Sequence, residues 1–570
     1  MTRPQIDPQL AGTLTAAIPP RLIKKLDAEP TLADKWTWTP TTVTTDKGET
    51  VTFVITEGVV TELACSCLLN PKCLHVAAVV TLLEPADGGA APIVSAEPVA
   101  AALQIELTGD MRDAATRAFR AVADVLAGGA QAAGAFAQAE LLRAIHACRA
   151  VGLHRLASGQ TRMLRSIRDL RADRPEFALE TLAGDLRDTL AVSHALTTGD
   201  SRNELVGTAR REYFAAGNLK LRGVLTEAVV ARSGYAGAVT YLIDDKGRMY
   251  SRSDINAGDA GRAAGAYDAA AGIGDAVLPH RELCRTGLFV EGATASRDGR
   301  LGAGQQVRAV RSSEPSRWDA EPLASRFTAP IETQLAAVAT HDAAPEEQRP
   351  AGWDFLYVEG PLVSGGGSVG IVAQGGIPVK LTTPLEQRVL AVRDNLVILA
   401  RAAGILVRAI GRVRVGAPRQ IEILALGPAP GETRLGFADA WHGRANVAYD
   451  RLSVSAQTSP PLDLAVAPSP PTADLLAALR RRVERAVLGG AGTLPTHAIG
   501  ELDREAAQLA ERALRTGSEV LRDLAALAHD AGRGATGARR KLDHEAFARA
   551  WLRAALYEDA ARRRLGVASW

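Results

Sequence analysis

The residues with the clearest chemical potential are three cysteines and one histidine near the start of the chain. Cys65 and Cys67 are separated by one residue, and so are Cys73 and His75, which gives the pattern C-x-C-x5-C-x-H. Three thiolates and one imidazole complete the tetrahedral shell of structural zinc and leave no position for a reactive water. The pattern therefore predicts one structural Zn2+ held by these four side chains. A redox pair is the alternative, but C-x-x-C is the more typical redox spacing.

Three strands and a helix are expected to position these ligands. Residues 36–45 and 50–56 are rich in Thr, Val and aromatic side chains, and Asp-Lys-Gly-Glu separates them, which predicts a β-hairpin. A third strand at residues 59–64 leads directly into Cys65, and an apolar helix is expected over residues 73–83. The predicted module is a small ββα zinc finger over residues 36–84.

The ligand pattern and its ββα setting resemble the SWIM-type zinc finger family, whose members carry C-x-C, a spacer and C-x-H. The resemblance implies that Cys65, Cys67, Cys73 and His75 are the ligands, and that the module binds DNA or another protein. The remainder is similar to long bacterial SWIM proteins at His280–Leu283 and at residues 299–304. That likeness implies a MoxR-type AAA+ ATPase and von Willebrand factor A-domain proteins as partners.

Local charge favours a protein partner for the finger over DNA. Residues 36–84 contain two lysines against five carboxylates, and most of the affinity for nucleic acid comes from neutralised phosphates. Trp36 and Trp38 alternate with threonines and are expected in the core or an interface, not as base-stacking platforms. The alternative is a DNA-binding protein that adds arginine clusters of the C-terminal region, at residues 480–482 with Arg485, 539–541 and 562–564.

Composition narrows the class of protein. A net charge of +2 over 570 residues gives no global attraction to nucleic acid or to anionic membranes. Five cysteines, three of them clustered, do not form a disulfide framework and are typical of a reducing cytoplasm. Residues 1–20 lack the pattern of a signal peptide, and no run of about 18 uncharged apolar residues occurs. We expect a cytoplasmic bacterial protein without a membrane partner.

The expected fold class is α+β, in several domains, because helical and strand-like periodicities occupy separate stretches. The expected layout is an N-terminal helical segment at 1–35, the ββα zinc finger at 36–84, a linker at 85–101, a helical domain at 102–230, a mixed β-rich domain at 231–345, a second mixed α/β-rich domain at 353–457, a Pro-rich linker at 458–471 and a helical C-terminal domain at 472–570.

No motif indicates catalysis. Residues 365–370 match both G-x-G-x-x-G and G-x-S-x-G, but both motifs need a helix to follow, and the next residues do not begin one. A glycine hairpin or loop is the better interpretation. No Walker A motif occurs, so the chain is not itself a P-loop ATPase.

We therefore predict a zinc-binding, non-enzymatic factor for protein–protein interaction and assembly, with no catalytic residues. An enzyme in the central β-rich region is a further hypothesis, and it predicts a deep polar pocket with convergent titratable groups.

Overall fold

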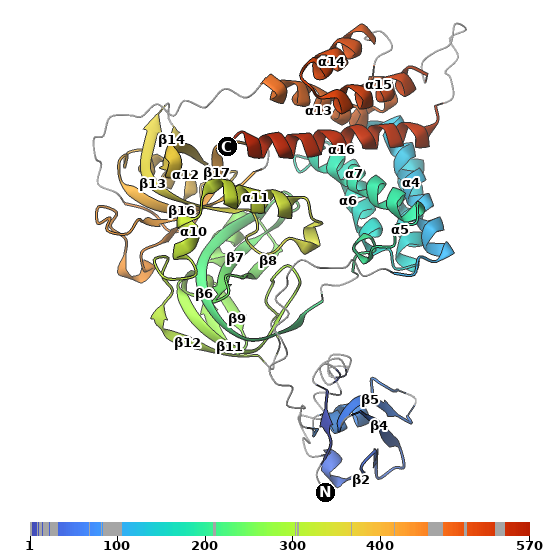
Figure 1. Ribbon diagram of the computed structural model, residues 1–570, viewed down its shortest axis with the longest axis vertical. Coiled ribbons are helices and arrows are strands. Elements are labelled where there is room, and N and C mark those ends of the chain that lie inside the picture. Colours follow the sequence, from blue (N-terminus) through green and yellow to red (C-terminus); the bar gives the residue numbers. More distant parts are fainter. Residues whose placement is uncertain are drawn as a thin grey trace. The chain divides into compact units, whose positions relative to one another are not determined.

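The chain folds as a mixture of helices and sheets, 44% helical and 27% strand, which confirms the mixed character of the predicted fold class. The computed structural model describes residues 3–7, 10, 14, 22, 32–56, 58–67, 69–80, 82–83, 105–208, 212–302, 304, 307–365, 368–414, 417–453, 471–494, 499–530 and 542–570. Contacts divide the chain into two compact units, Met1–Ala101 and Ala102–Trp570, which are described separately (Figure 1).

Some sequence-based predictions lie outside the described residues. They are most of the N-terminal segment at residues 1–35, the linker at 85–101, residues 458–470 of the Pro-rich linker, and the arginine cluster at 539–541.

The N-terminal unit is a five-stranded sheet with one helix. Its strands are β1 (Gln5–Ile6), β2 (Thr37–Trp38), β3 (Thr42–Thr44), β4 (Thr50–Thr56) and β5 (Val59–Cys65), in the order β1-β5-β4-β3-β2. The 3-10 helix η1 (Leu32–Lys35) precedes β2, and α3 (Leu74–Val80) follows the sheet. Val51 and Phe53 alternate with exposed residues along β4, as a half-buried strand requires, and pack in one core with Val76 of α3.

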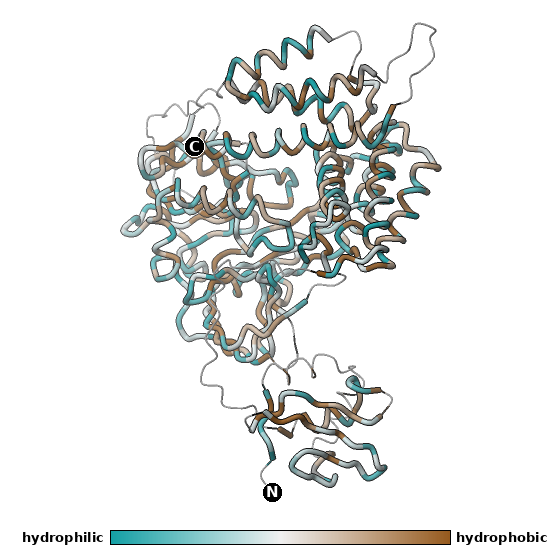
Figure 2. The backbone as a smooth tube through the Cα atoms, turned by 45° about the vertical axis from the view of Figure 1, so that its right-hand side comes forward, coloured by the Kyte–Doolittle hydropathy of each residue, from teal (hydrophilic) through white to brown (hydrophobic). Residues whose placement is uncertain are grey.

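Most helices of the large unit form one body. They are α4 (Gly109–Gly128), α5 (Ala135–Ala150), α6 (His154–Arg171), α7 (Leu179–Thr197), α13 (Pro471–Gly489), α14 (Ile499–Glu511), α15 (Arg515–Asp530) and α16 (His544–Ala568), with η2 (Ala130–Ala132), η3 (Asn203–Leu205) and η7 (Ala491–Thr493). Hydrophobic and hydrophilic residues alternate along these helices (Figure 2).

This helical body corrects the expected layout. Leu126 of α4, Met163 of α6, Val487 of α13 and Trp551 of α16 belong to one buried cluster. The helical regions predicted at 102–230 and 472–570 are therefore one structure and not two domains. Each contributes amphipathic helices, and these bury their apolar faces against one another across a long separation in sequence.

The first β-sheet of the large unit has the order β12-β11-β6-β7-β8. Its strands are β6 (Phe214–Ala231), β7 (Tyr235–Asp244), β8 (Met249–Ala257), β11 (Thr286–Ala295) and β12 (Arg308–Pro315), and β9 (Ala270–Ile273) with β10 (Ala276–Pro279) forms a separate hairpin. The prediction of helix up to residue 230 is wrong for β6. Its second half is a nearly continuous apolar run, which periodicity alone does not assign to helix or strand.

The second sheet closes into a small barrel. Its strands are β13 (Phe355–Gly365), β14 (Ser368–Ala373), β15 (Ile377–Thr382), β16 (Leu406–Val413) and β17 (Gln420–Pro428), and β18 (Ala445–Asn446) adds to its edge. They run in the order β15-β14-β13-β16-β17-β18, and a parallel pairing of β15 with β17 completes the ring. This connectivity, with α12 (Val392–Leu399) between β15 and β16, is that of OB-type barrels. The fold hosts many functions and assigns none.

One apolar cluster joins the two sheets. Tyr241 of β7, Phe355 of β13 and Ile410 of β16 are buried together, and the Tyr241 and Phe355 rings meet edge to face at 4.8 Å. The regions predicted as separate domains at 231–345 and 353–457 therefore share a core. The remaining elements are α8 (Ala260–Ala266), α9 (His280–Leu283), α10 (Ala324–Thr328), α11 (Ile331–Asp342), η4 (Glu346–Gln348), η5 (Gln374–Gly376) and η6 (Asp439–Trp441).

Candidate metal centre

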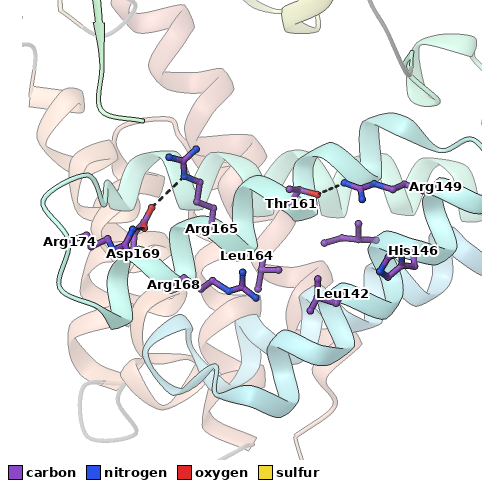
Figure 3. A pocket seen from close by; sticks show the side chains of 10 residues that line it. Leu142, His146, Arg149, Thr161, Leu164, Arg165, Arg168, Asp169 and Arg174 are labelled. Carbon is purple, nitrogen blue, oxygen red and sulfur yellow. Dashed lines mark hydrogen bonds and ion pairs between the residues drawn. The ribbon is translucent and has the colours of Figure 1, made fainter. Parts of the chain in front are cut away.

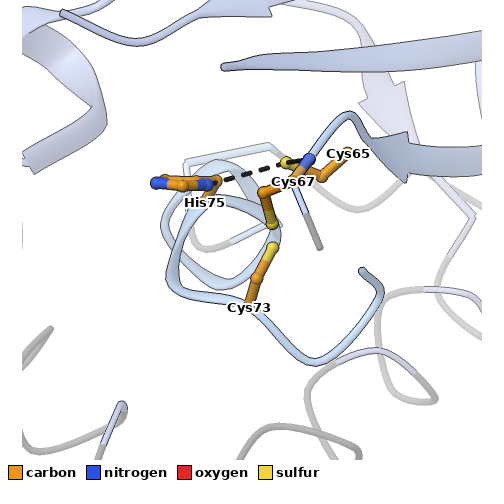
Figure 4. A group of neighbouring side chains, drawn as sticks. All are labelled: Cys65, Cys67, Cys73 and His75. Atoms are coloured by element: carbon orange, nitrogen blue, oxygen red, sulfur yellow. Dashed lines mark hydrogen bonds between the residues drawn. The ribbon is translucent and has the colours of Figure 1, made fainter. Parts of the chain in front are cut away.

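The N-terminal unit brings together the four side chains that the sequence singles out. Cys65 is the last residue of β5, Cys67 follows two residues later, and Cys73 and His75 lie at the start of α3. Their ligand atoms all lie within 4.8 Å of one another (Figure 4). A strand end and a helix start thus form a candidate metal site from a segment of eleven residues.

The spacing of Cys65 and His75 fits two ligands of a tetrahedral ion. The Sγ atom of Cys65 lies 3.6 Å from Nδ1 of His75. Zinc bonds of about 2.3 Å to sulfur and about 2.0 Å to nitrogen, at tetrahedral angles, would hold these two atoms about 3.5 Å apart. The donor set of three sulfurs and one nitrogen is consistent with zinc and provides a closed shell.

Hydrogen bonds and packing hold the ligands in place. The Cys65 N–H donates to Oδ1 of Asn70 over 2.8 Å, and the Val76 N–H donates to Sγ of Cys73 over 3.4 Å. The ring of Trp36, which is 8% exposed, meets the His75 ring edge to face at 5.8 Å. Such outer contacts orient metal ligands and limit their rotamers. Trp36 therefore supports the site from the core.

Burial weakens the acidity of two of the three clustered thiols, Cys65 and Cys73. Burial is the main reason that the pKa of Cys65 rises to about 12, and burial also raises the pKa of Cys73. Without a cation, these two thiols stay protonated at neutral pH. Since zinc binds thiolates, metal loading must release protons from the finger.

The other two cysteines take no part in this cluster. Cys148 is buried in the helical body, and Cys284 is buried beside Asn446 in the β region. In the part of the chain that the structure describes, no further group of three or more His, Cys, Asp or Glu side chains is placed to hold a metal.

A buried polar network in the β region escaped the sequence analysis. The Arg285 guanidinium donates to Asp450 over 2.6 Å, and the Tyr267 hydroxyl donates to the same carboxylate over 3.0 Å. Asn446 donates to the Tyr267 oxygen, and its own N–H donates to Asp450. Tyr267 and Arg285 lie more than 150 residues before Asn446 and Asp450 in the sequence, so no local pattern points to the network.

A polar cavity of about 580 Å³ lies between the helical body and the barrel. Its arginines pair with carboxylates: Arg187 with Asp559, Arg412 with Asp354, Arg480 with Glu180 and Glu484, and Arg563 with Asp342 and Asp559. The enzyme hypothesis anticipates a polar pocket with convergent titratable groups, and this cavity has that composition. Among these pairs, Arg563 with Asp342 joins α16 to α11, which packs against the barrel core, so this ion pair has a structural role between the helices and the barrel.

The glycine run at residues 365–370 connects two strands. β13 ends at Gly365 and β14 begins at Ser368, and these two residues pair directly, while residues 366 and 367 lie outside the described part. Neither motif that the run matches has the helix it requires, which agrees with the interpretation as a glycine hairpin.

The described C-terminal arginines are largely paired. Arg482 contacts Glu501 and Glu505, and Arg562 contacts Glu558 and Asp559. Guanidinium groups held by carboxylates are less able to neutralise phosphates.

Among the helices in the described part of the chain, none has the length and apolar character of a membrane span. Comparison of the chain with protein-family models, curated proteins and solved structures found no match. The arguments for function therefore rest on the geometry and chemistry of the site.

Proposed function

We propose that the chain is a zinc-binding, non-enzymatic factor for protein–protein interaction and assembly, whose finger is of the SWIM type. The observation that carries the proposal is the convergence of Cys65, Cys67, Cys73 and His75 into one closed donor set. Because a closed shell offers no water for hydrolysis, its role is to fix the fold of a small module. A fixed fold in turn presents a fixed surface to a partner.

The surface beside the metal ligands suits a protein partner. Leu69 lies in the loop between Cys67 and Cys73, and 63% of it is exposed. Asp46 and Glu62 are exposed acidic residues of the same unit. An exposed leucine on the loop between the metal ligands, in a unit with exposed carboxylates, fits an apolar pocket on a partner with basic groups. The resemblance to long bacterial SWIM proteins favours a MoxR-type AAA+ ATPase or a von Willebrand factor A-domain protein as that partner.

DNA binding is the alternative function, with the finger and the C-terminal arginines as its contacts. It predicts an affinity that falls steeply with salt. The acidic finger and the paired arginines weigh against it. The strands β14 and β15 of the barrel add Lys380 as their only cation and contain no aromatic residue, so they offer no platform for base stacking.

The test is a pulldown from host lysate with the zinc-loaded full-length protein. Samples with and without nuclease are compared for wild type, Cys73→Ser and Leu69→Ser. We expect a discrete protein set that survives nuclease and is lost in both variants. Leu69→Ser separates docking from folding, because the side chain is exposed and contributes little to the core.

Val54→Ser is the matched control for this experiment. Val54 is 49% exposed and lies on β4 three residues, or about 10 Å, from Val51. Val51 is the residue of β4 that pairs with Cys65. We expect Val54→Ser to keep the partners. Recovery of nucleic acid, or loss of every partner after nuclease, would overturn the proposal in favour of DNA binding.

A further inference from the structure

A groove with an unusual charge distribution lies on the large unit, between α5 and α6. Its volume is about 550 Å³. It is lined by Leu142, Ile145, His146, Arg149, Thr161, Leu164, Arg165, Arg168, Asp169 and Arg174 (Figure 3). It lies on a different unit from the metal ligands, so the metal site does not account for it.

The floor of the groove is apolar. Leu142 is 38% exposed, and the buried side chains of Ile145 and Leu164 lie beside it. In Figure 3 the Leu142 and Leu164 side chains lie between Arg149 at one end and Arg165 and Arg174 at the other. An open apolar strip between arginines can accept a hydrophobic side chain while the guanidinium groups stay in water.

The rim carries positive charge that the described residues do not neutralise. Four arginines face one carboxylate, Asp169, which Arg165 and Arg174 share at 4.0 and 3.6 Å. Arg149 donates to the neutral hydroxyl of Thr161, and Arg168 donates to the neutral amide oxygen of Gln138. Within the described part of the chain, Arg149 and Arg168 have no carboxylate partner. The groove therefore complements an acidic ligand.

The length of the charged strip distinguishes a peptide from a small anion. Arg149 is level with Thr161, and Arg168 lies seven residues further along α6, which is about 10 Å at the helical rise. Arg174 extends the strip beyond the end of α6. A single phosphate cannot bridge two helical turns, whereas carboxylates three, four and seven residues apart on a partner helix can.

We propose that this groove binds an acidic amphipathic helix of a partner protein, with leucine-type side chains on the floor and Asp or Glu side chains against the arginines. This is the helix-in-groove mode of recognition, with register set by charge. The site goes beyond the function proposed for the finger and does not depend on the metal.

The test uses fluorescence anisotropy with the full-length protein and a labelled 18-residue peptide. The peptide carries leucines at helical spacing on one face and glutamates on the other. One control peptide has the same composition but scattered leucines. The other keeps the leucine pattern and has lysine in place of glutamate. We expect the acidic amphipathic peptide to bind, and both control peptides to bind at least about tenfold more weakly.

Two charge-reversed variants locate the binding. Arg149→Glu with Arg168→Glu should weaken the peptide at least about tenfold, since it replaces attraction by repulsion at two points. Arg117→Glu with Arg143→Glu makes the same change in charge at exposed positions outside the groove and should leave binding unchanged. Cys73→Ser should also keep it, which separates this site from the finger.

Several outcomes would overturn the proposal. Equal binding of the peptide with scattered leucines would show charge attraction without a groove. Loss of affinity in both double variants would show no site at all. Displacement of the peptide by inorganic pyrophosphate at low millimolar concentration would identify a small-anion site. Concentration-dependent self-association that is lost only in Arg149→Glu with Arg168→Glu would identify a second copy of the chain as the occupant.

Discussion

The small N-terminal unit and the large remainder of the chain use their buried polar groups differently. In the finger, three thiols and an imidazole converge from eleven consecutive residues, and a cation is needed to stabilise them. In the β region, Arg285, Tyr267, Asn446 and Asp450 hydrogen-bond to one another directly. The first arrangement makes folding conditional on a ligand, while the second pairs polar groups of the chain with one another. This difference predicts which perturbations each unit tolerates.

The largest expected effect is metal removal. A structural zinc contributes about 10–16 kcal/mol to small zinc modules, as much as the whole stability of a typical domain. Chelation of zinc in the full-length protein should unfold the finger and leave the large unit folded. Two transitions in scanning calorimetry, of which one disappears on chelation and the other stays in place, would establish this. A common shift of both transitions would contradict the contrast between the units.

The buried Arg285–Asp450 ion pair provides a test for the large unit, whose polar groups pair within the chain. Both side chains are 6% exposed, and removal of one charge leaves the other buried without a partner. Asp450→Asn should destabilise the large unit by about 3–5 kcal/mol, as measured by denaturant unfolding, without change in metal content. The matched control is Asp394→Asn, which breaks an exposed pair with Arg451 and should cost under about 1 kcal/mol.

The helical body offers a test of its single core. Trp551 is fully buried, and its Nε1 donates to the Val483 carbonyl over 3.0 Å. Trp551→Ala should cost about 3–5 kcal/mol, because it opens a cavity between α16 and the other helices. Leu556→Ala on the same helix removes a side chain that is 43% exposed and should have little effect. Equal effects of the two variants would show that α16 does not belong to that core.

The N-terminal unit could be predicted from the sequence better than the large unit. Cys65 to His75 are neighbours in the chain, so type and spacing are enough to identify the candidate site. The shared helical core was missed because Val487 and Trp551 join Leu126 and Met163 across several hundred residues. Periodicity identifies an apolar face but not the surface that covers it.

The sheets show the same limit. The second half of β6 is a nearly continuous apolar run, and the sequence of such a run does not distinguish a helix from a strand. Closure of the barrel depends on three parallel pairings between β15 and β17, about 40 residues apart, which leave no local signal. The network around Asp450 is likewise a product of tertiary structure.

A smaller effect is expected from acid. Burial lowers the pKa of His280 to about 4, and its Nδ1 shares a hydrogen bond of 2.7 Å with the Thr240 hydroxyl. A depressed histidine pKa contributes stability that is complete above the unfolded value of about 6.5 and is lost as pH falls through 4. The large unit should lose about 3 kcal/mol from this residue over that range.

The measurement is the pH dependence of unfolding for wild type and for His280→Asn. The difference between the two proteins isolates the effect of the histidine from that of Asp450. Burial raises the pKa of Asp450, so its contribution to stability changes with pH in the opposite direction. A smaller slope between pH 6.5 and 4 is expected in the variant. Identical slopes would show that His280 does not titrate as its burial requires.

The most direct test of the central claim is the metal content of the intact protein. Native mass spectrometry of the full-length chain should find one zinc ion in wild type, none in Cys73→Ser, and one in Cys148→Ser, which removes a thiol outside the cluster. A wild-type chain without metal, a mass that reports a disulfide in its place, or zinc retained in Cys73→Ser would contradict the account.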